Sequence, residues 1–200
     1  MTHSASDGAS LHAPRRLFHM VFASVFPVMA LLLPYAWLLI ILLATAALVV
    51  LVDLARLRVN RLNAIFLRFF RPVVRPREET RVTGASYVLL GTLGAFVLYP
   101  RDAAVLAVLF TSLGDPVAGM VGQRAPGWRI LGKSPWGTAA MVATGLAVAG
   151  LMHFTGVIGF RWQIAAGALV AGIVELLSLP PDDNVWVPLA AGGFITLSGL

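Results

Sequence analysis

The sequence predicts an all-α, polytopic integral membrane protein with about seven transmembrane helices and one interfacial amphipathic helix. Of its 200 residues, 58 % are hydrophobic and 12 % are charged, whereas soluble domains carry about 45–50 % apolar and about 25 % charged residues. The mean hydropathy is +0.85. Since a spanning helix needs about 20 apolar residues, the chain has room for about six to eight spans. We therefore expect a single membrane-embedded domain over residues 15–200, after a flexible cytoplasmic tail over residues 1–14.

Composition also excludes several kinds of chemistry. The chain has no cysteine, which rules out disulfides, thiolate metal sites and a cysteine nucleophile. The net charge of +6 comes from basic residues beside apolar segments, where membrane topology and anionic lipid explain it. Nucleic acid is not an expected partner.

The first half of the chain predicts a helical hairpin followed by a surface helix. Pro34 interrupts a long apolar stretch and divides it into spans over about 17–33 and 35–55. Over 56–77, arginines alternate with apolar residues that share one helical face, which is typical of an interfacial amphipathic helix. The apolar residues of that face are Leu62, Ile65, Phe66, Phe69 and Phe70.

Five further apolar segments complete the predicted topology, over about 83–99, 102–122, 135–154, 162–179 and 185 to the C-terminus. With the N-terminus in the cytoplasm, this count places 13 of the 15 Lys and Arg residues in inside segments and leaves only Arg101 and Arg161 outside. Such a bias follows the positive-inside rule. We therefore expect a cytoplasmic N-terminus and an outside C-terminus.

Two acidic residues lie within predicted spans, where ionisable groups cost about 2.5–3.5 kcal/mol to insert. Asp115 and Glu175 both fall near the cytoplasmic ends of their spans, and the inside loop at 182–184 adds Asp182, Asp183 and Asn184. An ion pair that serves only helix packing is the structural alternative. Small residues at 114, 118 and 122 also predict close helix packing beside Asp115.

The inside loop that follows ends in Gly127-Trp128-Arg129-Ile130-Leu131-Gly132-Lys133-Ser134. This segment matches the nucleotide P-loop pattern formally, but no strand precedes it, so a P-loop fold is not expected. Ser134 followed by Pro135 predicts a helix start with free backbone N–H groups. With Arg124, Arg129 and Lys133 around it, and glycines at 132 and 137, that helix start is a plausible phosphate site, although a basic loop that serves topology alone remains the alternative.

Together these features predict phosphoryl transfer at the cytoplasmic face. Carboxylates that hold Mg²⁺ next to a cationic phosphate site are what this chemistry needs, because its catalysis is mostly positioning and charge neutralisation. In a membrane the acceptor would be a lipid alcohol.

The motifs resemble those of the polytopic lipid-alcohol kinases, which include dolichol, phytol and farnesol kinases and the CTP-dependent diacylglycerol kinase. Gly114-Asp115-Pro116-Val117-Ala118, Gly122, Gly132-Lys133-Ser134 and Gly137-Thr138 are similar to the signature G-D-x-x-A-x-x-x-G…G-K-S-x-E-G-[ST]. Weaker similarities cover Glu175 with Asp183-Asn184, Glu79 with Thr83-Gly84-Ala85, Arg16 with His19, and Asp53 with Arg56. Trp136 stands where the family has glutamate.

The resemblance implies a kinase-like domain that transfers the γ-phosphate of a nucleoside triphosphate, typically CTP, to a polyprenol, phytol, farnesol or diacylglycerol, with Mg²⁺ or another divalent cation. It implies catalytic roles for Asp115, Lys133 and Glu175 and metal-binding roles for Asp115, Glu175 and Asp183. The expected nucleotide-binding residues are Gly122, Arg124, Arg129, Gly132, Lys133, Ser134, Gly137 and Thr138. Further candidates by pattern are Arg16, His19, Asp53, Arg56, Glu79 and Asn184.

Two alternatives differ in class from a lipid kinase. A cytidylyltransferase that forms a CDP-lipid would release pyrophosphate, but the family's C-terminal K-D and H-G-G-x-x-D-R signature is absent. A small transporter whose buried acids carry ions would not need the helix start at Ser134. It would also usually show repeats or a polar outer mouth, whereas the outside loops are nearly free of charge.

Overall fold

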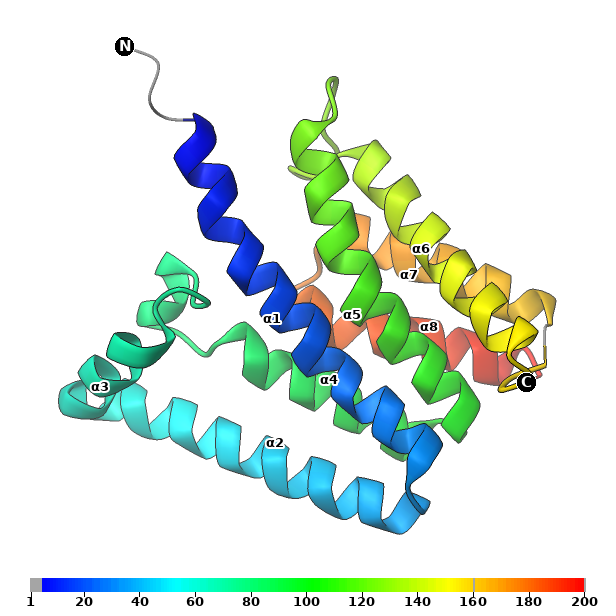
Figure 1. Cartoon of the computed structure of the whole chain (residues 1–200), viewed down its shortest axis with the longest axis horizontal. Helices are drawn as coiled ribbons and strands as arrows, with labels where there is room; N and C mark the ends of the chain where they lie inside the picture. The colour runs from blue at the N-terminus through cyan, green and yellow to red at the C-terminus, as the bar shows by residue number, and fades with distance from the viewer. Residues whose placement is uncertain (1–4, 160, 200) are drawn as a thin grey trace.

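The fold is all-helical throughout the described part of the chain. The computed structural model describes the backbone of residues 5–159 and 161–199, and the side chains of those ranges from residue 14 onward. Within these ranges there are eight α-helices and one short 3₁₀ helix, and no strand (Figure 1). In chain order they are α1 (Ala5–Leu32), α2 (Tyr35–Arg58), α3 (Asn60–Phe70), η1 (Pro76–Glu79), α4 (Gly84–Leu98), α5 (Arg101–Arg124), α6 (Pro135–Phe154), α7 (Trp162–Leu177) and α8 (Asp183–Leu197).

Four helices are long and apolar enough to cross a membrane, as expected of a membrane protein. They are α2, α5, α6 and the part of α1 over Pro14–Leu32. Helices α4, α7 and α8 have 15, 16 and 15 residues, and at 1.5 Å per residue each is about 22–24 Å long. A hydrocarbon core is about 30 Å thick, so the count of seven spans and the orientation of the termini stay predictions.

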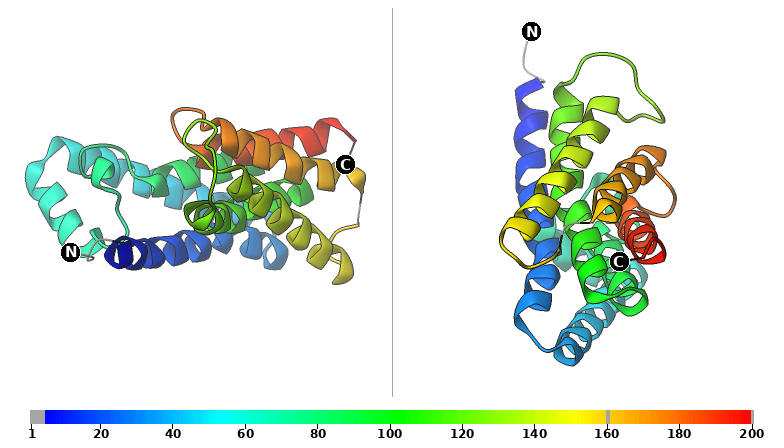
Figure 2. Two further views of the ribbon diagram at one scale, coloured as in Figure 1. Left: turned by 90° about the horizontal axis from the view of Figure 1, so that it is seen from above. Right: turned by 90° about the vertical axis from the view of Figure 1, so that its right-hand side faces the viewer.

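Helix α5 is the centre of the bundle. It packs against α1, α4, α6, α7 and α8. In its 18-residue apolar stretch 67 % is buried, compared with 22–28 % in the corresponding stretches of the other three long helices. Helix α1 lies on one side of α5, and α7 and α8 lie on the other (Figure 2). The buried first half of α5 consists mostly of small and branched apolar residues, which allow neighbouring helices to approach it closely. These include Ala103, Ala104, Val105, Leu106, Ala107 and Phe110.

Two local expectations differ from the structure. Residues 5–14 belong to helix α1, whereas the sequence predicted a flexible tail there; residues 1–4 lie outside the described part. The amphipathic helix expected over 56–77 is confined to α3, because Val59 adopts an extended conformation (φ −125°, ψ 105°) that separates it from α2. Pro76 begins the separate helix η1.

Helix α3 presents an apolar face that the protein does not cover. Leu62, Ile65, Phe69 and Phe70 are exposed, and no residue of α3 is buried. Helices α1 and α2 diverge from the bend at Pro34, and α3 lies at the open end of the resulting V (Figure 1). This divergence leaves space for the site described next.

Candidate functional site

A cavity of about 540 Å³ lies between α1, α2, α3, α4 and α5. Its volume is in the range of small-molecule sites, which measure about 300–1,000 Å³. Five of the residues predicted to have functional roles line it, namely Arg16, His19, Asp53, Asp115 and Asn184. Helices α1, α2, α5 and α8 thus bring together residues that are far apart in the sequence.

The cavity is polar at one end and apolar at the other. Along α1 the lining changes from Arg15 to Phe22, and along α2, which runs in the opposite direction, it changes from Asp53 to Leu48. Five to seven helical residues correspond to about 8–10 Å. We call the apolar end, formed by Phe22, Leu48, Val49 and Val88, the apolar arm. A ligand that fills this cavity is therefore expected to combine a polar head with a hydrocarbon chain.

Asp115 lies between the two parts of the cavity without a direct partner. It makes no hydrogen bond or ion pair with any residue that the structure describes, yet it is close enough to Arg15, His19, Glu175 and Asp183 to interact with them electrostatically. Pro116, the next residue along α5, also lines the cavity. The carboxylate of Asp115 is thus available to a ligand.

The residues Lys133, Glu175 and Asp183 form a second polar group, which we call the lysine cluster. The Lys133 Nζ lies 2.8 Å from Glu175 Oε1 and 2.6 Å from Asp183 Oδ2, and it also donates a hydrogen bond to the Glu175 carbonyl. Thr138 Oγ1 lies 3.5 Å from Glu175 Oε2. Asp182, the neighbour of Asp183, lies 3.6 Å from Arg75, which lines the polar end of the cavity, so the lysine cluster adjoins that end.

Charge and burial act in opposite directions on the lysine cluster. Burial lowers the pKa of Lys133, but the adjacent carboxylates of Glu175 and Asp183 outweigh it and hold this pKa above its ordinary value. Burial raises the pKa of Asp183, and the hydrogen bond from Lys133 opposes this rise without cancelling it. The ammonium group of Lys133 thus stays charged at neutral pH and compensates its two acidic neighbours.

Buried polar atoms without a hydrogen-bond partner gather at this end of the molecule. Among the described residues, four of the six such atoms are His19 Nε2, Ser134 Oγ, Asp183 Oδ1 and Asn184 Oδ1. Buried polar groups in folded proteins are nearly always paired with protein or ordered water. The concentration of unpaired atoms therefore indicates a place where a polar ligand or water belongs.

The carboxylates do not form a preassembled three-ligand metal site. Within the described ranges, no group of three or more His, Asp or Glu side chains is arranged to hold a metal ion, and the ammonium group of Lys133 lies between Glu175 and Asp183. Mg²⁺ in phosphoryl-transfer sites commonly uses one or two carboxylates and completes its shell with phosphate oxygens and water. The free carboxylate of Asp115 and the unpaired Asp183 Oδ1 fit that mode of binding.

The segment with the P-loop-like pattern forms a tight turn. Ile130 and Lys133 exchange two backbone hydrogen bonds of 2.8 and 2.9 Å, and Leu131 and Gly132 between them both have positive φ. Two successive residues of positive φ define a type I′ turn, so the glycine at 132 is explained by the turn. The amide of Lys133 is used within the turn. Arg124, Arg129 and Gly132 are exposed.

Helix α6 begins where the sequence predicted, but not with the predicted contacts. Ser134 is the N-cap residue and Pro135 follows it, yet the Ser134 side chain makes no capping hydrogen bond. A Cβ atom at Gly137 would lie 2.8 Å from the Ala118 carbonyl oxygen, and one at Gly122 would lie 3.4 Å from Ser134 Cβ. The space at Gly122 and Gly137 is thus filled by the packing of α5 against α6, which leaves no room there for a phosphate group.

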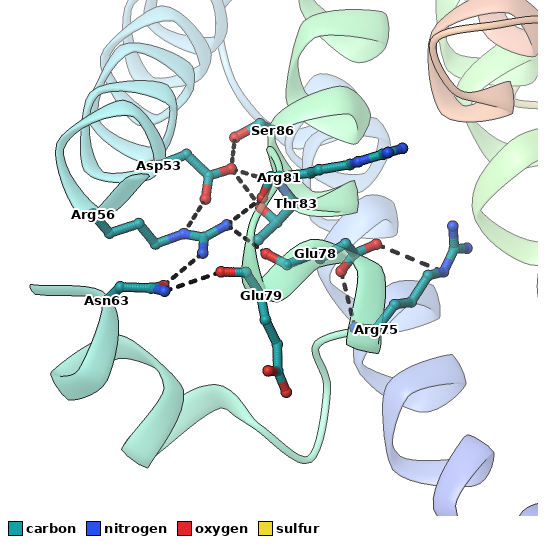
Figure 3. A network of polar contacts seen from close by, with 9 residues as sticks. All are labelled: Asp53, Arg56, Asn63, Arg75, Glu78, Glu79, Arg81, Thr83 and Ser86. Atoms are coloured by element: carbon teal, nitrogen blue, oxygen red, sulfur yellow. Dashed lines mark hydrogen bonds and ion pairs between the residues drawn. The ribbon is translucent and has the colours of Figure 1, made fainter. Parts of the chain in front are cut away.

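Asp53 and Arg56 belong to a closed structural network (Figure 3). Arg56 Nε donates to Asp53 Oδ1 at 2.6 Å, and Asp53 Oδ2 accepts from the Thr83 amide, the Thr83 hydroxyl and the Ser86 hydroxyl at 2.6–2.8 Å. The other guanidinium nitrogens of Arg56 donate to Asn63 Oδ1 and to the carbonyl oxygens of Glu78 and Arg81. This Asp53 network joins α2, α3 and the start of α4.

Of the two adjacent glutamates, Glu78 reaches the cavity and the predicted Glu79 does not. Glu78 is buried and lines the cavity, and its Oε2 accepts a hydrogen bond of 3.1 Å from the Arg75 amide. The Glu79 side chain points away from the network (Figure 3), 3.9 Å from Arg71. A sequence signal for this difference exists, because Glu78 follows Pro76 at the third helical position, where glutamate commonly bonds back to the cap residue.

Comparisons with known proteins assign no activity. No protein-family model and no solved structure matches the chain. The chain is similar to a protein of Rickettsia prowazekii (strain Madrid E) named Uncharacterized protein RP860, with 24 % identity over 184 residues. The alignment covers 88 % of this chain and 89 % of that protein.

Proposed function

We propose that the protein is a membrane phosphotransferase that transfers the γ-phosphate of a nucleoside triphosphate to the hydroxyl group of a lipid alcohol. The observation that carries this proposal is the position of Asp115, which has no direct partner and lies between an apolar arm and a cluster of polar groups. The resemblance to lipid-alcohol kinases favours CTP as the phosphate donor.

The cavity supports a lipid as the acceptor. A hydrocarbon chain lying against Phe22, Leu48, Val49 and Val88 would bring its hydroxyl group to the level of Asp115. Burial of apolar area stabilises such a complex by about 25 cal/mol per Å². Asp115 would then accept the hydroxyl proton or help to hold Mg²⁺.

The lysine cluster supports phosphate chemistry beside this acceptor. Lys133 carries a fixed positive charge next to the cavity, and Asp183 has one unpaired carboxylate oxygen. When Mg²⁺ is bound, it would neutralise charge on the phosphate oxygens, with Asp115 and Asp183 as its protein ligands. Thr138 and Lys133 orient Glu175, which acts in this scheme by holding the ammonium group in place.

The proposed site faces the cytoplasm. The excess of Lys and Arg in segments predicted to lie inside supports an orientation with a cytoplasmic N-terminus and an outside C-terminus. In that orientation the lysine cluster and the polar end of the cavity are on the side where nucleoside triphosphates are available.

A labelling experiment tests this function. Purified protein in detergent is incubated with Mg²⁺, γ-labelled CTP or ATP, and farnesol, phytol, a polyprenol or diacylglycerol. The expected result is labelled lipid in the organic phase, together with the nucleoside diphosphate. With a lipid phosphate such as phosphatidate in place of the alcohol, release of labelled pyrophosphate and formation of a CDP-lipid would instead identify a cytidylyltransferase. No nucleotide turnover with any lipid would contradict the proposal.

A further inference from the structure

Three arginines line the polar end of the cavity. Arg15 and Arg16 come from α1, and Arg75 comes from the segment before η1. All three are half-buried. We call them the arginine mouth.

Their positive charge is only partly compensated by the protein. Arg75 lies 3.6 Å from both Glu78 and Asp182, and Arg16 donates one long hydrogen bond of 3.4 Å to the Gly119 carbonyl. Arg15 makes neither an ion pair nor a hydrogen bond within the described part of the chain, and Glu78 and Asp115 act on it only at longer range. The remaining acidic residue of the lining, Asp53, is already paired with Arg56.

His19 provides a second, independent observation at the same place. Its Nε2 is buried, has no hydrogen-bond partner among the described residues, and belongs to a side chain that lines the cavity. His19 follows Arg15 by four residues and Arg16 by three, so all three lie on one face of α1. An unpaired buried nitrogen beside under-compensated arginines indicates a missing polar ligand.

The chemistry of these residues fits a phosphate group. A guanidinium group offers planar pairs of N–H donors that match phosphate oxygens, and such charge-assisted hydrogen bonds are stronger than neutral ones. The helix start at Ser134 is less suitable, because Lys133 is held by two carboxylates and Gly137 is packed against α5.

We propose that Arg15, Arg16 and Arg75 bind a phosphate group at the mouth of the cavity, with His19 completing the polar wall. This site deepens the proposed function and rests on it, because that function provides the phosphate-bearing ligand. The phosphate group belongs either to the nucleoside triphosphate or to a phosphorylated single-chain lipid whose tail lies in the apolar arm. In both cases the phosphate lies on the same side of Asp115 as the arginines.

The test measures binding without turnover. Full-length protein in detergent is titrated with pyrophosphate, CTP, farnesyl phosphate and farnesol, by calorimetry for each compound. The variants are Arg75→Gln and the double variant Arg15→Gln/Arg16→Gln, and the matched control is Arg68→Gln, an exposed residue of α3 outside the cavity. The double variant is included because Arg15 and Arg16 make only one hydrogen bond, from Arg16, among the described residues. Its folding is therefore expected to be normal, as measured by thermal unfolding.

We expect each arginine lost to weaken phosphate binding by about tenfold, as for hydrogen bonds to charged groups, and Arg68→Gln to bind like wild type. Binding of CTP and pyrophosphate, but not farnesyl phosphate, identifies the nucleotide as the source, and the reverse pattern identifies the lipid. No phosphate binding by wild type, or equal binding by wild type and the double variant, overturns the inference. If phosphate binding depends on the arginines but no lipid is phosphorylated, the proposed function fails while this site stands.

Discussion

Asp53 and Asp115 are the same residue type and line the same cavity, but their surroundings are opposite. Asp53 has four close donors, from Arg56, Thr83 and Ser86, whereas Asp115 has none among the described residues. A buried charge with all its hydrogen bonds made serves to fix structure, while a charge without partners remains available to a ligand. The contrast separates the acid that fixes structure from the one that we propose acts on a ligand.

Breaking the Asp53 network is expected to have the largest effect on stability. Asp53→Ala leaves the fully buried guanidinium group of Arg56 without its carboxylate, and loss of one partner of a buried ion pair costs about 3–5 kcal/mol. Thermal unfolding in detergent should show a large fall in Tm. The exposed acid Asp102, changed to Asn, is the control, and a Tm of Asp53→Ala equal to that of the control would contradict the structural role.

Removing the cation of the lysine cluster is expected to have a smaller effect and to change the response to metal. Lys133→Met leaves Glu175 and Asp183 uncompensated at a half-buried position, which should cost about 2–3 kcal/mol. Because two carboxylates are then free, added Mg²⁺ should raise the Tm of this variant more than that of wild type. Equal shifts with Mg²⁺ would mean that these carboxylates do not bind the ion.

Substituting Gly137 distinguishes helix packing from phosphate binding. Gly137→Ala places a methyl group 2.8 Å from the Ala118 carbonyl, and overpacking of this kind costs about 1–2 kcal/mol, in the lower part of its usual range. Once folded, the variant should have an unchanged KM for the nucleotide. A selective increase of KM without loss of Tm would restore the phosphate-binding role that the sequence suggested for this glycine.

The smallest effects are expected for the adjacent residues Glu78 and Glu79. Glu79→Gln alters a half-exposed side chain at the molecular surface and should change stability by less than about 0.5 kcal/mol. Glu78→Gln weakens the contact with Arg75 and should cost about 1 kcal/mol. Paired unfolding curves measure the two losses of stability, and a larger loss for Glu79→Gln would contradict the placement of Glu78 as the buried glutamate of the pair.

Helix positions were largely predictable from the sequence because apolar length and proline placement control them. Pro34, Pro100 and Pro135 each lie at or next to a helix boundary in the structure. The expected end of the second span, near residue 55, lies three residues before the observed end at Arg58. There Val59 leaves the helix without any local breaker, and the Asp53 network holds the chain.

The sequence predicts the site residues of types that are rare inside membranes. It does not single out those of types that are common at the membrane surface. Asp115, Glu175 and Asp183 were identified because acidic groups in or beside spans require a reason. Arg15 and Arg75 were interpreted as topology signals, since basic residues at the cytoplasmic face are ordinary. Only the tertiary structure shows that they converge on one cavity.

The most direct test of the account is the rate of phosphate transfer to lipid by wild type, Asp115→Asn and Asp102→Asn in matched amounts. Asp115→Asn keeps the shape of the side chain but removes its charge. We therefore expect the free energy of unfolding to remain within about 0.5 kcal/mol of the wild-type value and the rate of transfer to fall by about 100-fold or more. Asp102→Asn should transfer phosphate at the wild-type rate. Wild-type transfer by Asp115→Asn would contradict the central claim that this carboxylate acts on the substrate.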